Sequence, residues 1–179
     1  MKFTRTKFKN LIIVSHNLIF DQRGYFKETF RNNLLDYEIG YKFDFCQENN
    51  VFSKLNVLRG LHFQVEPFAQ SKYITVLEGK ILDIAVDIRI NSDTYGKYFS
   101  YELSSDKHES IFIPRGFAHG YLTLTSNAVV NYKVDNYYNP NSESGILFSD
   151  KFLNIDWGID LNKIIISKKD INFKPYDWK

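Results

Sequence analysis

The sequence predicts an all-β protein, either an antiparallel sandwich or a small barrel, with a few short helices. Aromatic residues make up 17% of the 179 residues, and aromatic side chains are typical of pleated, half-buried strands. Short segments in which apolar and polar residues alternate recur along the chain, with turn signals about every 8–12 residues. Because a single early segment has the spacing of a helix, the layers of the fold must be built from strands.

The expected strands are short and follow one another through the chain. They cover residues 11–15, 44–52, 56–64, 70–77, 80–89, 97–104, 110–114, 119–125, 127–135 and 144–148. Residues 31–39 predict a helix, and the last twenty residues have room for another short one. Gly and Pro are dispersed, with neither a linker nor a repeat, so residues 1–179 are expected to form one domain.

Two neighbouring strand predictions carry more detail. Glu78-Gly79-Lys80 predicts a hairpin turn that joins residues 70–77 to residues 80–89. The second strand alternates between an apolar face and a mostly polar face. The apolar face holds Leu82, Ile84, Val86 and Ile88, and the other face holds Asp83, Ala85, Asp87 and Arg89. Such alternation is typical of a strand that turns one face to a core.

Composition excludes several classes of protein. The formal net charge of +2 is too small for a typical nucleic-acid binder. The single cysteine, Cys46, excludes an internal disulfide and a cysteine-rich zinc site. No apolar run approaches the roughly 18 residues of a transmembrane helix, and the apolar part of the basic first segment, residues 11–14, is too short for a secretory signal. We therefore expect a soluble cytoplasmic protein that binds neither nucleic acid nor membrane.

The strand at residues 127–135 gives the first indication of a site. Tyr132 shares one strand face with Val130 and Val134, so alternation points its side chain into the apolar interior. A core tyrosine whose hydroxyl is satisfied has the same pattern. In a barrel, however, the interior is also the ligand cavity, and there the hydroxyl would face a ligand.

Other polar side chains stand among apolar ones. Strict alternation would put Arg59 and His62 on opposite strand faces, whereas a bulge at Gly60 would bring both inward. Lys72 shares a face with aliphatic residues, which suits either a snorkelling edge residue or a ligand to an anion. His119 lies between a proline turn and a strand, flanked by glycines. A surface arginine and a packed histidine would also fit these patterns.

Taken together, these segments resemble the dTDP-4-dehydrorhamnose 3,5-epimerases, cupin-type jelly-roll barrels that epimerise nucleotide-linked 4-keto-6-deoxy sugars. The matching stretches lie in order and at similar spacing over nearly the whole chain. They are residues 20–30, 46–64, the strand of Lys72, 81–89, 92–104, 113–124, 131–146 and 155–170. The chain departs from the family pattern at Glu48, at Arg115 and in residues 67–71 before Lys72. None of these departures removes a catalytic group.

The reaction that the resemblance implies needs a base, an acid and a cation near the enolate oxygen. A ketone at C4 acidifies the protons on C3 and C5, and inversion removes a proton from one face and returns one to the other. By resemblance, His62 is the general base and Asp170 is the carboxylate that orients it. Tyr132 is the acid on the opposite face, since a phenol with an ordinary pKa of ~10 stays protonated. Lys72 is the cation near the enolate oxygen.

The resemblance also implies a set of substrate-binding residues. Arginine forks and lysine point charges suit a diphosphate, and an aromatic face with polar partners suits a base. The residues that match diphosphate contacts are Arg23 and Arg59, with Lys168 or Lys169. Those that match contacts to the base are Phe26, Glu28, Gln47, Asn49 and Tyr138. Those that match positions near the sugar are Glu143 and the polar pair of His119 and Asp83.

Partners and cofactors follow from the same resemblance. In the family the N-terminal strands cross to the partner chain, which implies a homodimer in which residues 23–28 serve the neighbour's site. No redox cofactor is needed, and the chain has neither of the usual glycine-rich cofactor loops. Metal-binding cupins use a His-x-His pair with a downstream Glu and His, but His62 is followed by Phe63-Gln64, so the second histidine is missing. His16 and His108 lie in surface-like contexts. We therefore expect no cofactor and no metal.

Several alternatives stay open. A related enzyme would invert C3 alone, or act on another nucleotide-linked 4-keto sugar or a heptose, for example one linked to GDP. A keto-sugar isomerase of similar fold would move the carbonyl, and Tyr132 and Asp170 argue against it. A non-catalytic sugar-binding cupin would have lost the base or the acid, whereas His62 and Tyr132 are both present.

Overall fold

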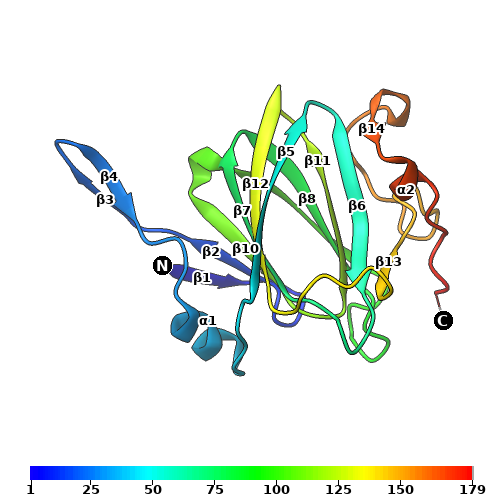
Figure 1. Ribbon diagram of the computed structural model, residues 1–179, viewed down its shortest axis with the longest axis horizontal. Coiled ribbons are helices and arrows are strands. Elements are labelled where there is room, and N and C mark those ends of the chain that lie inside the picture. The colour runs from blue at the N-terminus through cyan, green and yellow to red at the C-terminus, as the bar shows by residue number, and fades with distance from the viewer. Residues whose placement is uncertain (179) are drawn as a thin grey trace.

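The computed structural model describes residues 1–178 and contains two six-stranded sheets and a separate hairpin. The first sheet has the order β1 (Lys2–Arg5), β2 (Ile12–Ser15), β10 (Glu109–Ile113), β7 (Lys72–Glu78), β12 (Asn127–Val134) and β5 (Gln47–Lys54). The second has the order β13 (Glu143–Gly145), β6 (Val57–Gln64), β11 (Phe117–Thr123), β8 (Lys80–Asp87) and β9 (Tyr98–Ser104), with β14 (Ile165–Ile166) beside β6. The two sheets form the walls of a barrel (Figure 1).

The expected all-β, cupin-type jelly-roll barrel is confirmed. Every strand pairing is antiparallel except that of β14 with β6. Strands that follow one another in the chain often belong to different sheets, as β6, β7 and β8 do. Aliphatic side chains of both sheets, such as Ile74 and Val130 from the first and Ile81 from the second, meet between them in one core.

The expected hairpin at Gly79 is wrong, because β7 and β8 do not pair. β7 lies between β10 and β12, and β8 lies between β11 and β9 in the other sheet. Gly79 turns the chain from one sheet to the other with φ of +76°, and a Cβ atom there would lie 2.2 Å from the carbonyl oxygen of Asn127. A tight corner between sheets needs the same small residue as a hairpin turn, so the local sequence did not separate them.

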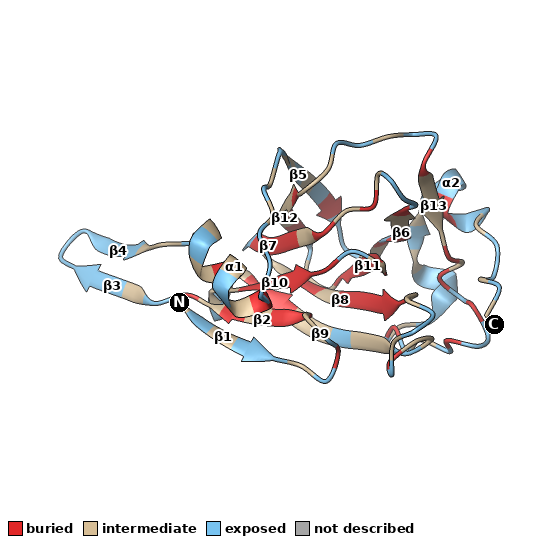
Figure 2. Ribbon diagram, turned by 90° about the horizontal axis from the view of Figure 1, so that it is seen from below, coloured by how far each residue is buried: buried red, intermediate tan, exposed pale blue. Residues whose placement is uncertain are grey.

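Both faces of β8 are buried (Figure 2). Its apolar face, which carries Ile84 and Val86, packs outside the barrel under the C-terminal segment around Trp157. The other face carries Ala85 into the barrel core and Asp83 into a fully buried position. The predicted alternation is therefore correct, and the mostly polar face is the one that lines the interior.

The two expected helices are present and short. α1 (Asn32–Ile39) buries Leu35 and Ile39 against the first sheet and ends at Gly40 with φ of +82°. α2 (Lys168–Ile171) is a single turn whose N-cap is Ser167. Two 3₁₀ turns, η1 (Ser105–Lys107) and η2 (Leu161–Lys163), complete the regular structure. No helix within the described residues is both long and apolar enough to cross a membrane.

The hairpin of β3 (Leu18–Asp21) and β4 (Gly24–Lys27) projects away from the barrel (Figure 1). The sequence prediction had no strands here. Its large apolar side chains are open to solvent, with exposed fractions from 52% to 70% for Ile19, Phe20, Tyr25 and Phe26. A two-stranded hairpin with exposed aromatic residues has no core of its own. Tyr25 and Lys27 contact His108, but most of the apolar surface of the arm is open to solvent.

Candidate active site

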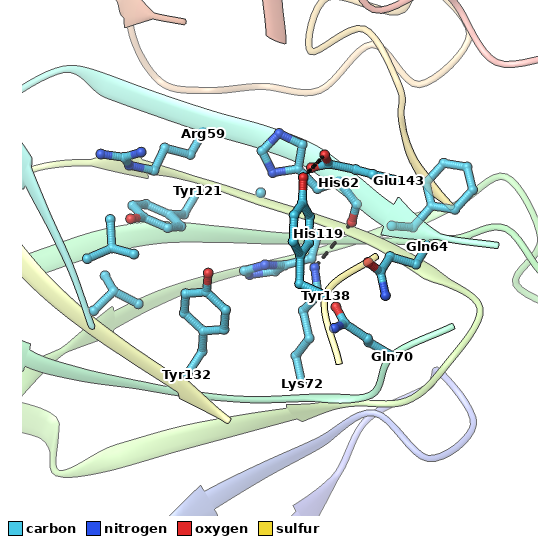
Figure 3. A pocket seen from close by; sticks show the side chains of 14 residues that line it. Arg59, His62, Gln64, Gln70, Lys72, His119, Tyr121, Tyr132, Tyr138 and Glu143 are labelled. Carbon is cyan, nitrogen blue, oxygen red and sulfur yellow. Dashed lines mark hydrogen bonds between the residues drawn. The ribbon is translucent and has the colours of Figure 1, made fainter. Parts of the chain in front are cut away.

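A cavity of about 190 Å³ lies between the two sheets. β12 and β7 of the first sheet contribute Tyr132 and Lys72, and β6 and β11 of the second contribute His62 and His119 (Figure 3). The expectation that these four side chains line one cavity is confirmed. His62 and Tyr132 come from different sheets, so they stand on opposite walls of the cavity.

A bulge in β6 brings Arg59 and His62 to the same cavity. Across β6 and β11, Arg59 pairs with Tyr121 and His62 pairs with His119, so two residues of β6 oppose the single Gly120. Gly60 has φ of +114°, and a Cβ atom there would lie 2.6 Å from the Gly120 Cα. Glycine at this position permits both the bulge and the close approach of the strands.

His62 and Asp170 form a hydrogen-bonded pair, as expected. Nε2 of His62 donates to Oδ1 of Asp170 over 2.9 Å, and the second carboxylate oxygen accepts from the Gly60 backbone N–H. This contact fixes the tautomer and leaves Nδ1 of His62, to which no other described residue hydrogen-bonds, as the basic nitrogen. Burial of Asp170 opposes its ionisation, but the hydrogen bond from His62 and those from Gly60 and Ser167 hold the pKa of the carboxyl below its usual value.

The C-terminal segment places Asp170 beside His62. β14 runs parallel to β6, and α2 follows immediately with the Ser167 side chain capping the Asp170 N–H. The ring of Phe173 then packs edge-on against the His62 imidazole, with the ring centroids 5.6 Å apart. A Cβ atom on Gly145 would lie 2.4 Å from the Phe173 ring. The segment thus holds both the carboxylate and one face of the imidazole.

His119 and Asp83 form a second, more deeply buried pair. Nε2 of His119 donates to Oδ2 of Asp83 over 2.7 Å, and the other carboxylate oxygen has no hydrogen-bond partner among the described residues. The prediction had placed His119 at a loop–strand junction, but it lies inside β11 and is paired across the sheet with His62. Two histidine–carboxylate pairs therefore stand side by side on one wall.

Lys72 and Tyr132 stand on the facing wall. The Lys72 ammonium donates to the His62 carbonyl oxygen over 3.3 Å. Burial lowers the pKa of Lys72 to about 8, although the charges of Asp83 and Glu143 act in the opposite direction. Burial raises the pKa of Tyr132, against a smaller opposite effect of Arg59. Tyr132 is thus held as a protonated phenol, and Lys72 is a cation that can lose its charge slightly above neutral pH.

The rim of the cavity holds a group of polar contacts. Tyr138 donates its hydroxyl to Glu143, which also forms an ion pair with Lys169. The backbone N–H of Tyr138 donates to the side chain of Gln47, and Gln47 in turn donates to Asn49. Of these predicted binding residues, Tyr138 and Glu143 line the cavity, whereas Gln47, Asn49 and Lys169 are linked to them without lining it.

Some predicted residues lie elsewhere in this chain. Arg23, Phe26 and Glu28 are on or next to the β3–β4 hairpin, outside the cavity. Arg23 pairs with Asp21, Glu28 pairs with Arg31, and the Phe26 side chain is exposed. The side chain of Lys168 is exposed in α2 and does not line the cavity.

One histidine was assigned wrongly, and several lining residues were missed. His16 is buried and hydrogen-bonded to Ser110, and burial lowers its pKa to about 4, so its context is not surface-like.

The missed lining residues are Val51, Phe63, Gln64, Gln70, Gly120, Tyr121 and Val130. Of these, Tyr121 could have been found, because alternation places it on the same face as His119. Among residues 1–178, no group of three His, Cys, Asp or Glu side chains is arranged to hold a metal ion.

A family model, curated proteins and solved structures all match this chain to the same family. A family model described as dTDP-4-dehydrorhamnose 3,5-epimerase matches residues 5–177. A curated protein of that name from Methanothermobacter thermautotrophicus is 44% identical over 175 residues, which cover 97% of this chain and 94% of the relative. The crystal structure of such an epimerase from Elizabethkingia anophelis has a TM-score of 0.95 and 41% identity, covering 98% of this chain and 96% of that one. A structure of dTDP-6-deoxy-D-glucose-3,5-epimerase from Legionella pneumophila, in complex with dTDP-4-keto-L-rhamnose, has a TM-score of 0.92 and 36% identity, with coverage of 97% and 92%.

Proposed function

The chain belongs to the dTDP-4-dehydrorhamnose 3,5-epimerase family, and we propose that it inverts C3 and C5 of dTDP-4-dehydro-6-deoxyglucose through an enolate. Its enzyme class is that of the family, an isomerase that acts on a nucleotide-linked sugar. The observation that carries the proposed mechanism is the position of the His62–Asp170 pair and Tyr132 on opposite walls of one cavity. Inversion at a carbon requires a base and an acid on opposite faces of the sugar.

In the proposed reaction His62 removes the proton next to the ketone. Its Nε2–H is committed to Asp170, so Nδ1 carries the lone pair that takes the proton, and the carboxylate stabilises the imidazolium that forms. Tyr132 returns a proton from the other face. Lys72 supplies positive charge for the oxygen of the enolate, where charge develops between the two steps. Before the second carbon reacts, the His62 imidazolium must lose its proton and the Tyr132 phenolate must gain one, both by exchange with water; the same pair can then act again.

Two measurements test the function. Proton NMR of the substrate in D₂O should show solvent deuterium at both C3 and C5; deuterium at C3 alone would identify an enzyme that inverts only that carbon. A thermal-shift screen with dTDP, GDP, CDP and UDP should show the largest rise in melting temperature with dTDP, because a ligand that binds the folded state stabilises it. An absence of deuterium at both carbons would refute the proposed activity.

The charge on Lys72 gives a pH prediction. Because the pKa of Lys72 is about 8, kcat/KM is expected to fall as the pH rises through about 8, where the ammonium is lost. Lys72→Met should lower kcat by about 10²-fold, the usual loss for one group that stabilises an oxyanion. The pH profile of the wild type and of this variant checks both statements; a descending limb that persists near pH 8 in the variant would assign it to another group.

The lowered pKa of Lys72 also makes the stability of the fold depend on pH. The pKa of Lys72 is lower in the folded chain than the ~10.4 of a free lysine, so the unfolded state binds more protons between these values. Stability of the wild type relative to Lys72→Met should therefore rise from about pH 8 to about pH 10. Urea unfolding of both proteins across this range measures it.

A homodimer with exchanged N-terminal hairpins completes the proposal. Phe26 is exposed on an arm that projects from its own barrel, and among the described residues Arg23 hydrogen-bonds only to Asp21 of the same arm. In the dimer, Arg23, Phe26 and Glu28 would contribute to the neighbour's cavity, beside Gln47 and Asn49. This arrangement would bury the exposed aromatic side chains and add positive charge for the diphosphate.

Complementation between variants tests the exchange. Arg23→Ala and His62→Asn chains, each impaired as a homodimer, should recover activity when they are unfolded together and refolded as a mixture. Each mixed dimer would contain one site with both His62 and Arg23 intact and one site with neither. A mixture no more active than its two components, at a mass that confirms mixed dimers, would contradict the exchange.

A further inference from the structure

Tyr121 is a cavity residue that the mechanism above leaves without a role. It lies on β11 with its side chain almost fully buried, and it is paired across the sheet with Arg59. Figure 3 shows its ring between Arg59 and Tyr132, on the wall that also carries His119. The hydroxyl proton of a buried tyrosine needs a hydrogen-bond acceptor, because burying an unpaired hydroxyl costs free energy of folding.

Hydrogen bonds around Ser53 fix the direction of that proton. Nε of Arg59 donates to the Ser53 hydroxyl over 3.0 Å, and a guanidinium can only donate. Oγ of Ser53 also lies 3.2 Å from the Tyr121 hydroxyl. Ser53 is buried, and its side chain has no other hydrogen-bond partner among residues 1–178. Its proton is therefore satisfied only if Ser53 donates to Tyr121.

The opposite orientation is less favourable. If Tyr121 donated to Ser53, the serine proton would be buried without an acceptor, with the usual penalty for such a group. In the favoured orientation the chain runs from the Arg59 cation through Ser53 to Tyr121. A chain that begins on a cation polarises each following hydroxyl and makes the last one a stronger donor. The last donor is the Tyr121 O–H, at the wall of the cavity.

We propose that Tyr121 is a further substrate-binding residue, whose hydroxyl donates a hydrogen bond to an acceptor oxygen of the nucleotide sugar next to Arg59. The ligand class rests on the proposed function; the direction of the donor does not. Burial raises the pKa of Tyr121, so the donor is present at any pH at which the enzyme works. The diphosphate is the expected source of the oxygen, because Arg59 attracts the most negative part of the substrate.

Tyr121→Phe tests the contact because it removes the hydroxyl alone. Titration calorimetry with dTDP should show an affinity about 10-fold or more below that of the wild type, as for one lost hydrogen bond to a charged group. Affinity for thymidine, which has no phosphate, should be unchanged. Tyr101→Phe is the matched control, since that hydroxyl is bonded to Glu109 away from the cavity, and it should bind dTDP like the wild type.

The chain itself is tested with Ser53→Ala. This variant keeps the Tyr121 hydroxyl but removes its link to Arg59, and it should weaken dTDP binding less than Tyr121→Phe does. It also keeps the proposal testable if Tyr121→Phe fails to fold. Unchanged binding of both dTDP and dTDP-glucose by Ser53→Ala would contradict the polarised chain.

A second ligand, dTDP-glucose, shows whether the acceptor oxygen belongs to the diphosphate or to the sugar. A loss seen with both dTDP and dTDP-glucose assigns the contact to the diphosphate, whereas a loss seen only with dTDP-glucose assigns it to a sugar oxygen. Unchanged binding of both ligands by folded Tyr121→Phe would overturn the proposal. That result is distinct from failure of the proposed function, in which the wild type itself would neither bind dTDP nor exchange deuterium into the substrate.

Discussion

Asp170→Asn is expected to lower kcat by about 10²-fold or more, the order of loss seen when a base-orienting carboxylate is removed. The carboxylate accepts the His62 Nε2–H and so leaves Nδ1 as the basic nitrogen. An amide in its place can donate to Nε2, which would move the imidazole proton to Nδ1 and block abstraction. The amide also carries no charge to stabilise the imidazolium. Steady-state kinetics measures the loss, and dTDP affinity should change little.

The same substitution has a pH-dependent effect on stability. Burial disfavours the charged form of Asp170, but hydrogen bonds from His62, Gly60 and Ser167 lower its pKa below the unfolded value. A depressed carboxyl pKa stabilises the fold above the unfolded pKa of ~3.9, and this contribution is lost as the pH falls through the folded pKa. The difference in unfolding free energy between the wild type and Asp170→Asn should therefore narrow as the pH falls below about 4.

Asp150→Asn is a suitable control for the C-terminal segment. Asp150 is buried and accepts from the Tyr176 N–H and the Trp178 indole, so it anchors the same segment without touching His62. It should lower the melting temperature and leave most of kcat. A kcat that is unchanged in Asp170→Asn would mean that another group orients His62, and the proposed dyad would then be wrong.

The antiparallel β architecture could be predicted because its strands carry period-2 signals that do not depend on distant parts of the chain, whereas the choice of a jelly-roll barrel over a sandwich came from the resemblance to a family. Alternation placed Tyr132 inside, and a glycine in the strand of His62 indicated the bulge that turns Arg59 inward. Alternation defines two faces but does not say which is the interior. On β8 the apolar face lies outside the barrel because residues around Trp157 cover it, and nothing local to residues 80–89 indicates that cover.

Contacts over long sequence separations could not be derived from pattern. Asp170 is 108 residues from His62 and lies in a one-turn helix without amphipathic repeats, so resemblance to a family supplied the pairing. The Gly79 corner was mistaken for a hairpin, because the turn residue does not specify whether the next strand pairs or crosses. The β3–β4 hairpin has little hydrophobic core, and its exposed aromatic residues gave no alternating signal.

The largest contrast is expected between His62→Asn and Tyr132→Phe. His62→Asn removes the base, so neither inversion nor exchange of solvent deuterium should occur at either carbon. Tyr132→Phe keeps His62 and its bond to Asp170 and loses only the opposing hydroxyl. His62 can then abstract a proton and return a solvent-derived one to the same face. The expected result is deuterium next to the ketone with little or no inversion.

The two variants should differ because the two side chains lie on opposite walls of the cavity. Tyr132 extends from β12 in the first sheet and His62 from β6 in the second, with the cavity between them. A single group cannot reach both faces of a carbon bound between these walls, so loss of one wall's group should separate exchange from inversion. The raised pKa of Tyr132, which burial causes, keeps the phenol protonated and ready to donate.

Proton NMR of the substrate in D₂O records both events in one sample, since loss of a carbon-bound proton signal reports exchange and a change in coupling pattern reports inversion. Tyr101→Phe, which removes a hydroxyl outside the cavity, should invert and exchange like the wild type. Rapid inversion by Tyr132→Phe would identify water or another side chain as the acid and leave Tyr132 as a wall of the cavity. If folded His62→Asn still exchanged deuterium, His62 would not be the base, because another group would then have removed the proton.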